Sequence, residues 1–352
     1  MIPSASIVIN NRNYGQYVAS AIDSALSQTR AAEVIVVDDG SDDDSDAVIQ
    51  SYRDRVFALR QEQSGQAAAL NRGIEVASGD IVILLDSDDL MDRNKVERIL
   101  RAFEDAPEVE WLRHDLRAIA GEMVVAQRYY PLRKHPDPLQ EVRSVGDATG
   151  TTSALAFRAS FLGAIGPIPE ERYPTFADRY LMVVAALLGQ CATIDEVLGS
   201  RRLHADQVTS YGPSDTGRTR FHLKLGESIA CDAAWQASRH GIHPDIAEGR
   251  LWWQQKLRFE ARKGGVVGGG RAFPFLIGML SGLVGSDLSL PRRAGMAVRE
   301  LILATLPPAW FRRAWWRTHL GRRSTVSGLL SRNVDQQASA LVAIMSSVLI
   351  SF

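Results

Sequence analysis

Residues 79–89 read GDIVILLDSDD, and this stretch decides the fold of the chain. The aliphatic run Ile81–Leu85 is too short for a buried helix and is typical of a strand covered on both faces, as in a parallel sheet. Carboxylates follow where this strand leaves the sheet, and ligands of open α/β sheets bind beyond the carboxyl ends of the strands. The competing interpretation is a solvated turn whose aspartates cap a helix that starts near Met91.

The spacing of the acids indicates a metal site. Asp86 and Asp88 flank one residue, so a turn can bring both side chains towards one point at the exposed mouth of the strand. Two carboxylates held together repel unless a cation or a shared proton compensates. A hard divalent ion is the simplest compensation, since Mg²⁺ takes only one or two protein carboxylates together with substrate phosphates. We therefore predict a divalent metal, Mn²⁺ or Mg²⁺, as cofactor.

Strands alternate with helices through the first part of the chain. The expected strands cover residues 7–9, 34–37, 56–59 and 81–85, and the expected helices cover residues 17–26, 47–52, 67–77 and 96–103. Strict alternation predicts a parallel sheet with right-handed crossovers. Asn10-Asn11 and Asp38-Asp39 end two further strands, and this clustering of polar residues at one sheet edge favours a ligand site over independent turn capping.

The pattern changes after about Trp111. Short strands are expected at residues 115–120, 123–129, 153–157 and 197–203, with a helix at 176–188, and further helices at 219–240 and 246–263. A glycine-rich break follows at residues 264–270. The sequence thus predicts an α/β part, residues 1–212, and a mainly helical C-terminal extension, residues 213–352.

Composition narrows the class of protein. The chain has 352 residues, 45% of them hydrophobic and 23% charged, with a net charge of −1 that gives no reason to expect nucleic acid as a partner. Two cysteines, Cys191 and Cys231, argue against a disulfide framework. No apolar run reaches the roughly 18 to 20 residues of a spanning helix, and no basic signal segment precedes the first strand. A cytoplasmic location is expected.

Several other binding motifs are absent. Neither a P-loop pattern nor GxGxxG follows a strand, and there is no HExxH, CxxC or GxSxG. What remains is an acid-lined crevice that could bind a nucleotide diphosphate through a metal, with the metal neutralising the diphosphate as a leaving group.

At this point the motifs, taken in order, resemble those of family 2 glycosyltransferases. They are INNRNYG at residues 9–15, Ser24…Gln28-Thr29, VVDDGS at residues 36–41, Gly65…Asn71…Gly73 and LLDSDD at residues 84–89. The resemblance covers roughly residues 4–210. It implies the GT-A fold, with a nucleotide-sugar-binding half over about residues 1–105 and an acceptor half over about residues 106–212.

The resemblance also implies roles on the donor side. Asp38 and Asp39 would lie at the base and ribose, Asp86 nearer the ribose and sugar, and Asp88 would be the main metal contact. The remaining donor-site candidates from these motifs are Asn10, Arg12, Asn13, Gly65 and Asn71. Arg12 departs from the family, which commonly has an aromatic residue there, so a guanidinium contact would replace stacking on the base.

On the acceptor side, FADRYL at residues 176–181 matches the family motif whose aspartate, here Asp178, is the general base. Ala177 replaces the acid that usually precedes it. The late stretch Arg202-Leu203-His204…Ser210 is similar to one whose histidine can complete the metal site, whereas the residues alone suggest that His204 is a surface side chain.

We therefore predict a metal-dependent inverting glycosyltransferase that uses a nucleotide-sugar donor, and the donor that we expect is a UDP-sugar. Its acceptor would be a glycan or lipid-linked glycan in bacterial surface polysaccharide synthesis. One alternative is a non-catalytic nucleotide-sugar-binding module. Another is a phospho-receiver domain, which needs acids after the first strand where this chain has Asn10 and Asn11.

A stretch near the C-terminus combines basic and aromatic residues. It contains Arg292, Arg293, Arg299, Arg312, Arg313, Arg317, Arg322 and Arg323, with Trp310, Phe311, Trp315 and Trp316 among the later arginines. This composition suits a helix in the headgroup layer of an anionic membrane, which would make the protein peripheral on the inner face. Alternatively, the aromatic residues pack on the catalytic domain and the arginines are solvated.

Overall fold

A computed structural model describes residues 3–129, 132, 137–145, 148–204, 207 and 216–242. Four of the sequence predictions lie outside these residues. They concern the helix at 246–263, the glycine break at 264–270, the arginine-rich stretch at 292–323, and Ser210.

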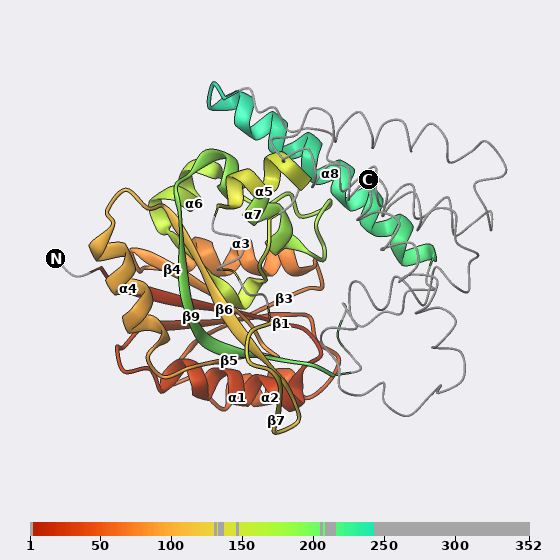
Figure 1. Ribbon diagram of the computed structural model, residues 1–352. Helices are drawn as coiled ribbons and strands as arrows, with labels where there is room; N and C mark the ends of the chain where they lie inside the picture. Colours follow the sequence, from red (N-terminus) through yellow and green to blue (C-terminus); the bar gives the residue numbers. More distant parts are fainter. Residues whose placement is uncertain are drawn as a thin grey trace, which may run out of the picture.

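The described residues form one nine-stranded sheet with helices on both faces (Figure 1). The strands are β1 (Ala5–Asn11), β2 (Glu33–Asp39), β3 (Phe57–Gln61), β4 (Ile81–Asp86), β5 (Leu90–Met91), β6 (Trp111–Ala120), β7 (Met123–Ala126), β8 (Leu155–Arg158) and β9 (Cys191–Arg202). The helices are α1 (Gly15–Leu26), α2 (Ser45–Gln50), α3 (Gln66–Val76), α4 (Lys95–Asp105), α5 (Pro138–Val145), α6 (Ala159–Ile165), α7 (Ala177–Leu188) and α8 (Thr216–Arg239). Across the sheet the order is β3-β2-β1-β4-β8-β6-β9-β5, and β7 pairs with β6.

The first four strands are parallel, as the alternation predicts. In this register Asn10 of β1 lies opposite Asp86 of β4, and Asn11 lies opposite Asp38 of β2. The polar ends of three strands therefore meet at one edge. Beyond β4 the sheet is mixed, because β8 runs antiparallel to both β4 and β6 while β6 and β9 are parallel.

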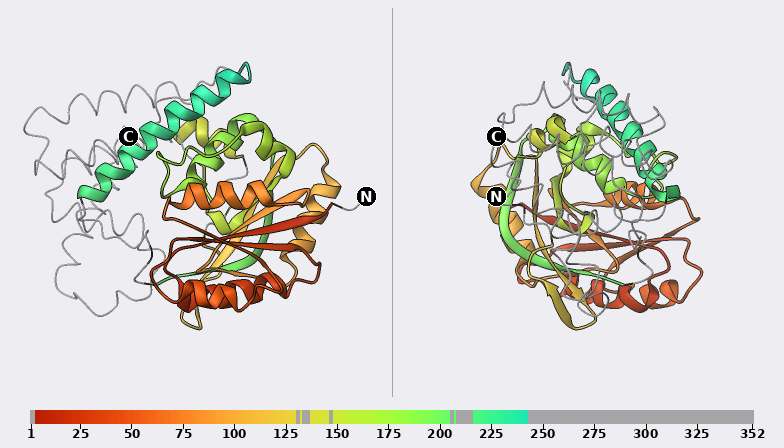
Figure 2. Two further views of the ribbon diagram at one scale, coloured as in Figure 1. Left: turned by 180° about the vertical axis from the view of Figure 1, so that it is seen from behind. Right: turned by 45° about the vertical axis from the view of Figure 1, so that its right-hand side comes forward.

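Alternate residues of the central strands supply two separate cores. Val8 and Val82 point to the face covered by α3, α7 and α8, whereas Ile7 and Ile83 point to the face covered by α1 and α4. Figure 2 shows α1 and α2 on one side of the sheet and α3 and α8 on the other. Strands buried on both faces need continuous aliphatic sequence, which is why Ile81–Leu85 lacks the polar alternation of a half-exposed strand.

The helix expected over residues 96–103 is confirmed as α4, whereas the competing interpretation, in which a helix starts near Met91, was wrong. Leu90 and Met91 form the short strand β5 instead, which pairs antiparallel with Ser200 and Gly199 of β9, and α4 begins only at Lys95. Pairing with a strand distant in sequence overrides the local preference. The acidic turn therefore joins two strands, and its aspartates do not cap a helix.

Helix α8 confirms the helix predicted at residues 219–240. It buries Leu225, Ile229 and Ala233 in the core on the α3 side, and Asp232 accepts a hydrogen bond of 2.7 Å from the hydroxyl of Tyr173. The division of the chain at residue 212 stays a prediction. Within the described part of the chain, no helix has the length and apolar character needed to cross a membrane.

The crossing of α3 over β1 depends on Gly73, where an added Cβ would overlap Val8 Cγ1 and lie 3.3 Å from Val37 Cγ2. We expect Gly73→Ala to lower the free energy of unfolding by about 1 to 3 kcal/mol through overpacking. Gly163→Ala is the matched control, since Gly163 lies on an exposed part of α6 with nothing within 4 Å. It should stabilise by about 0.5 to 1 kcal/mol through helix propensity. Urea unfolding measures both, and equal effects would contradict this packing argument.

Candidate active site

The acids after β4 converge. Asp86, Asp88 and Asp89 each present an oxygen within 4.8 Å of the others, and the turn is closed by a 3.0 Å hydrogen bond from Asp89 N to Asp86 O. Asp88 and Asp89 are only 7% and 2% exposed, so the expectation of an exposed Asp88 was wrong. Sequence reasoning left Asp89 out of the site, although the presence of a third acid in the same turn, directly after Asp88, indicated that it could take part.

Burial and mutual repulsion make this cluster electrostatically costly. Burial, then Asp88, Asp89 and Asp178, raise the pKa of Asp86 well above its usual value. Burial followed by Asp88 raises the pKa of Asp89 to about 7, and Arg201 acts in the opposite direction. An all-oxygen donor set under such repulsion fits a hard divalent cation, which would favour the ionised carboxylates.

A buried lysine lies near these acids. Lys95 is fully buried on α4 and donates a 2.7 Å hydrogen bond from Nζ to the carbonyl of Ser153. Burial lowers the pKa of Lys95 to about 7, while Asp89 and Asp92 act to raise it. Sequence reasoning missed Lys95; the available signal was a lysine one turn before Ile99 in the apolar stripe of α4.

The end of β9 brings basic side chains to the cluster. His204 Nε2 lies 3.0 Å from Asp88 Oδ2, and its ring packs at 4.6 Å between centroids on Tyr17. Arg202 N donates to Asp89 Oδ1 at 3.0 Å, and the Arg202 guanidinium lies over the Tyr17 ring at 5.2 Å. With its side chain only 10% exposed, His204 is not the surface residue that local sequence suggested. Its role as a metal ligand stays a prediction.

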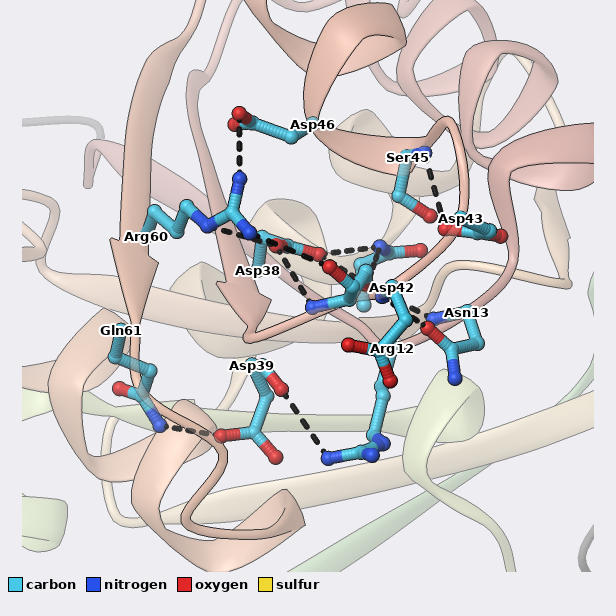
Figure 3. A network of polar contacts seen from close by, with 12 residues as sticks. Arg12, Asn13, Asp38, Asp39, Asp42, Asp43, Ser45, Asp46, Arg60 and Gln61 are labelled. Carbon is cyan, nitrogen blue, oxygen red and sulfur yellow. Dashed lines mark hydrogen bonds and ion pairs between the residues drawn. The ribbon is translucent and has the colours of Figure 1, made fainter.

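Figure 3 shows the polar network beyond β2. Asp38, 1% exposed, accepts a 2.8 Å hydrogen bond from Asn11 Nδ2 and pairs with Arg60 Nε at 3.9 Å. Asp39, 3% exposed, accepts hydrogen bonds from Gln61 Nε2 at 2.8 Å and Gly65 N at 2.8 Å. Both carboxylates thus fix the loops that follow β1, β2 and β3.

The loop after β1 is held against the loop after β2. Asn13 has a left-handed backbone (φ 55°); its N–H donates to Ser41 Oγ at 2.9 Å, and its Oδ1 accepts from Asp42 N at 2.8 Å. Arg12 reaches the carbonyl of Asp39 at 3.4 Å. Arg12 and Asn13 therefore line the same edge as the acids of β2.

The two other asparagine candidates differ in their surroundings. Asn10 lies beside Asp86 in the sheet, and its buried Oδ1 has no hydrogen-bond partner among the described residues. Asn71 instead uses both ends of its amide on Ile168, with Nδ2 to O and N to Oδ1 both at 2.9 Å. This clamp between α3 and the chain after α6 gives Asn71 a structural part, and its role in donor binding stays a prediction.

Asp178 lies in the first turn of α7. Its Oδ2 accepts from Thr152 N at 3.1 Å and its Oδ1 from Arg179 N at 2.8 Å. Burial raises the pKa of Asp178, although these hydrogen bonds and Arg201 oppose the increase. Because the charge of Asp178 in turn raises the pKa of Asp86, the two carboxylates belong to one electrostatic site.

Comparison with known proteins agrees with this arrangement. Residues 6–150 match the family model described as glycosyl transferase family 2. An uncharacterized glycosyltransferase of Nostoc sp. is 32% identical over 210 residues, which cover 56% of this chain and 64% of the relative. The succinoglycan biosynthesis protein ExoU of Rhizobium meliloti is 37% identical over 98 residues, 27% of this chain and 29% of that protein. The chain thus spans less than two thirds of either relative.

Two solved structures share the fold. Mannosyltransferase PcManGT of Pyrobaculum calidifontis, in complex with GDP-Man and Mn²⁺, superposes with a TM-score of 0.53 at 18% identity, covering 90% of this chain and 83% of that one. Residues 1–349 of S. aureus TarS, in complex with UDP, give a TM-score of 0.51 at 17% identity, covering 86% and 80%. At such identities the likeness shows the fold alone.

Because the pKa of Asp89 is raised, replacing Asp89 by the uncharged asparagine should increase the free energy of unfolding in a pH-dependent way. Folding shifts this pKa from 3.8 to about 7, so the protonated form stabilises the metal-free protein at low pH, and this stability is lost as the pH rises towards 7. Asp89→Asn keeps an oxygen for Arg202 N without the charge. We expect the variant to match wild type at pH 4 and to exceed it at pH 8 by up to about 4 kcal/mol, since the shift is about three units and one unit of pKa is worth about 1.4 kcal/mol.

Thermal unfolding at both pH values, without metal, measures the difference. Asp54→Asn is the control, because the Asp54 side chain is 93% exposed and should show no such pH dependence. A variant that gains nothing at pH 8 would contradict the electrostatic cost assigned to the cluster.

Proposed function

We propose that this chain, which has the GT-A fold and whose residues 6–150 match the model of glycosyl transferase family 2, transfers a sugar from a nucleotide-sugar donor to an acceptor hydroxyl. One observation carries the proposal. A cluster of three acids, Asp86, Asp88 and Asp89, the last two of them buried, lies at the carboxyl end of β4, and a separate acid on the acceptor side, Asp178, interacts with it electrostatically. A non-catalytic binding module has no need of the second acid, so the intact Asp178 argues for the enzyme.

The proposed donor is a UDP-sugar. The loops after β1, β2 and β3, held by Asp38 and Asp39, would form the nucleotide pocket, with Arg12, Asn13, Asn10 and Gly65 beside it. TarS, one of the proteins with this fold, was solved with UDP, whereas PcManGT was solved with GDP-Man. A GDP-sugar is therefore the alternative donor, and a binding experiment has to distinguish it from a UDP-sugar.

The proposed metal is Mn²⁺ or Mg²⁺. Asp88 would hold it, with Asp86 nearer the sugar and His204 completing the set, since His204 Nε2 lies 3.0 Å from Asp88 Oδ2. When bound, the metal supplies charge neutralisation of the diphosphate leaving group. The proximity of the three acids supports this assignment, because a cation would relieve their repulsion.

The proposed base is Asp178. Its carboxylate would take the proton of the acceptor hydroxyl during attack on the anomeric carbon, and a single displacement inverts that centre. Thr152 N and Arg179 N fix the orientation of the carboxylate, and its raised pKa makes it a better proton acceptor than an ordinary aspartate.

The proposed acceptor is a glycan or lipid-linked glycan, with the protein acting in the cytoplasm on bacterial surface polysaccharide. ExoU, whose name places it in succinoglycan biosynthesis, supports this setting. Peripheral membrane contact through residues 292–323 is part of the same proposal and concerns residues outside the described ones.

A binding experiment tests the donor and metal proposals together. Calorimetry with UDP and with GDP, each with and without Mn²⁺, should show metal-dependent binding of UDP by the wild type. Asp88→Asn should abolish the metal dependence, because it removes the carboxylate that faces His204. Unchanged affinity in the variant would remove Asp88 from the metal site.

A kinetic experiment tests the base. Asp178→Asn should reduce sugar transfer by about 10² to 10⁴, the usual contribution of general-base catalysis, while UDP and Mn²⁺ bind normally. Release of UDP from a panel of UDP-sugars in the presence of candidate acceptors provides the assay. Transfer within a few-fold of wild type would leave Asp178 as a helix-terminal acid and place the base elsewhere.

A further inference from the structure

Gln66, the first residue of α3, connects the two acidic groups through its side-chain amide. Its Nε2 donates towards Asp86 Oδ1 at 3.4 Å and towards Thr152 Oγ1 at 3.3 Å, and its Oε1 accepts from Ala177 N at 3.1 Å. One amide therefore bonds with its donor end to the acid at the end of β4 and with its acceptor end to the beginning of α7.

The backbone around Gln66 is fixed on the same side. Gln66 N donates to the carbonyl of Pro174 at 2.9 Å, and Gly65 has φ +98°, a conformation that favours glycine. A Cβ at Gly65 would lie 2.6 Å from Pro174 Cα, so only glycine allows this approach. The start of α3 is thereby seated directly against the chain that leads into α7.

The acceptor-side groups that bond to Gln66 are those next to the proposed base. Thr152 donates its N–H to Asp178 Oδ2 at 3.1 Å, and Ala177 immediately precedes Asp178. Phe176, the residue before α7, has a left-handed backbone with φ 61°, which is unfavourable for an aromatic residue and requires surrounding contacts to persist. The hydrogen bond from Ala177 N to Gln66 Oε1 is such a contact.

We propose that Gln66 is a positioning residue that keeps Asp178 in register with Asp86, so that donor binding at β4 orders the base on α7. The inference rests on the proposed function, since it assigns Gln66 a part in the same transfer. An amide suits the position because it donates at one end and accepts at the other, whereas a carboxylate could not donate to Asp86. Such alignment matters because a displacement of about 1 Å at a reacting group can cost on the order of 10² in rate.

The test follows amide hydrogen exchange in the full chain, with UDP and Mn²⁺ as the probe. In the wild type, the probe should slow exchange both at residues 38–41 and at residues 177–179, the second by about tenfold. In Gln66→Met, which keeps the length of the side chain without its polar atoms, the first effect should remain and the second should fall below about twofold. Gln50→Met is the matched control, because Gln50 is exposed at the end of α2, outside the loops assigned to the nucleotide.

One further variant and one kinetic measurement distinguish a positioning role from a structural one. Gln66→Glu keeps the acceptor for Ala177 N but places a carboxylate beside Asp86, so residues 177–179 should stay ordered without the probe and lose their response to it. In the transfer assay, Gln66→Met should lower kcat by about 10- to 100-fold with the UDP affinity within about twofold of wild type. A merely structural role would lower stability and nucleotide affinity together.

The outcomes separate the two proposals. If residues 177–179 respond to the probe equally in Gln66→Met and wild type, or do not respond in wild type while residues 38–41 do, the inference about Gln66 is overturned and the proposed function stands. If neither UDP nor GDP with Mn²⁺ slows exchange anywhere, the proposed function fails, and the inference fails with it.

Discussion

Repulsion among carboxylates that are buried side by side is the constraint on which this structure depends. The aliphatic strand β4 ends in three acids whose oxygens lie within 4.8 Å of one another, and water reaches little of Asp88 and Asp89. Isolated ions in such surroundings are costly unless they are paired or neutralised. The neighbouring elements supply the compensation: the charges of Lys95 on α4 and Arg201 on β9 act on Asp89, and Arg202 N donates a hydrogen bond to it.

Compensation of the acids depends on β9, a strand far from them in sequence that lies beside them in the sheet. Strand β9 runs alongside β6 and then pairs with β5, so that its end arrives at the acidic turn. Ser153 reinforces the junction, since its Oγ accepts from Asp86 N at 3.0 Å and its carbonyl accepts from Lys95. The site is therefore built from two segments distant in sequence, with the three acids after β4 and the side chains of Arg201, Arg202 and His204 at and just after the end of β9.

The sequence was most informative where local pattern and burial agree. The run Ile81–Leu85 and the acids after it predicted both the central strand and the convergence of Asp86 and Asp88. Elements that depend on pairing between distant segments were not predicted from the local sequence. An example is β5, whose partner residues lie on β9. Lys95 and Gln66 were missed because a polar residue on a helix looks the same in sequence whether it faces water or a buried acid. His204 was reached only through the family resemblance, since its proximity to Asp88 depends on the whole path of β9.

The pairing of β5 with β9 also has a consequence for biosynthesis. Leu90 pairs with Ser200, so the acidic turn cannot acquire its contacts with Arg202 and His204 until the chain beyond residue 204 has left the ribosome. Until then, the emerging sheet of β1 to β4 carries its acids without the contacts from β9. Contacts between residues so far apart in sequence form slowly, because the entropy cost of closing the loop arises before the contacts can stabilise the chain. The strands β1 to β4 are thus made first, but their acids gain the contacts with Arg202 and His204 only after β9 has been translated.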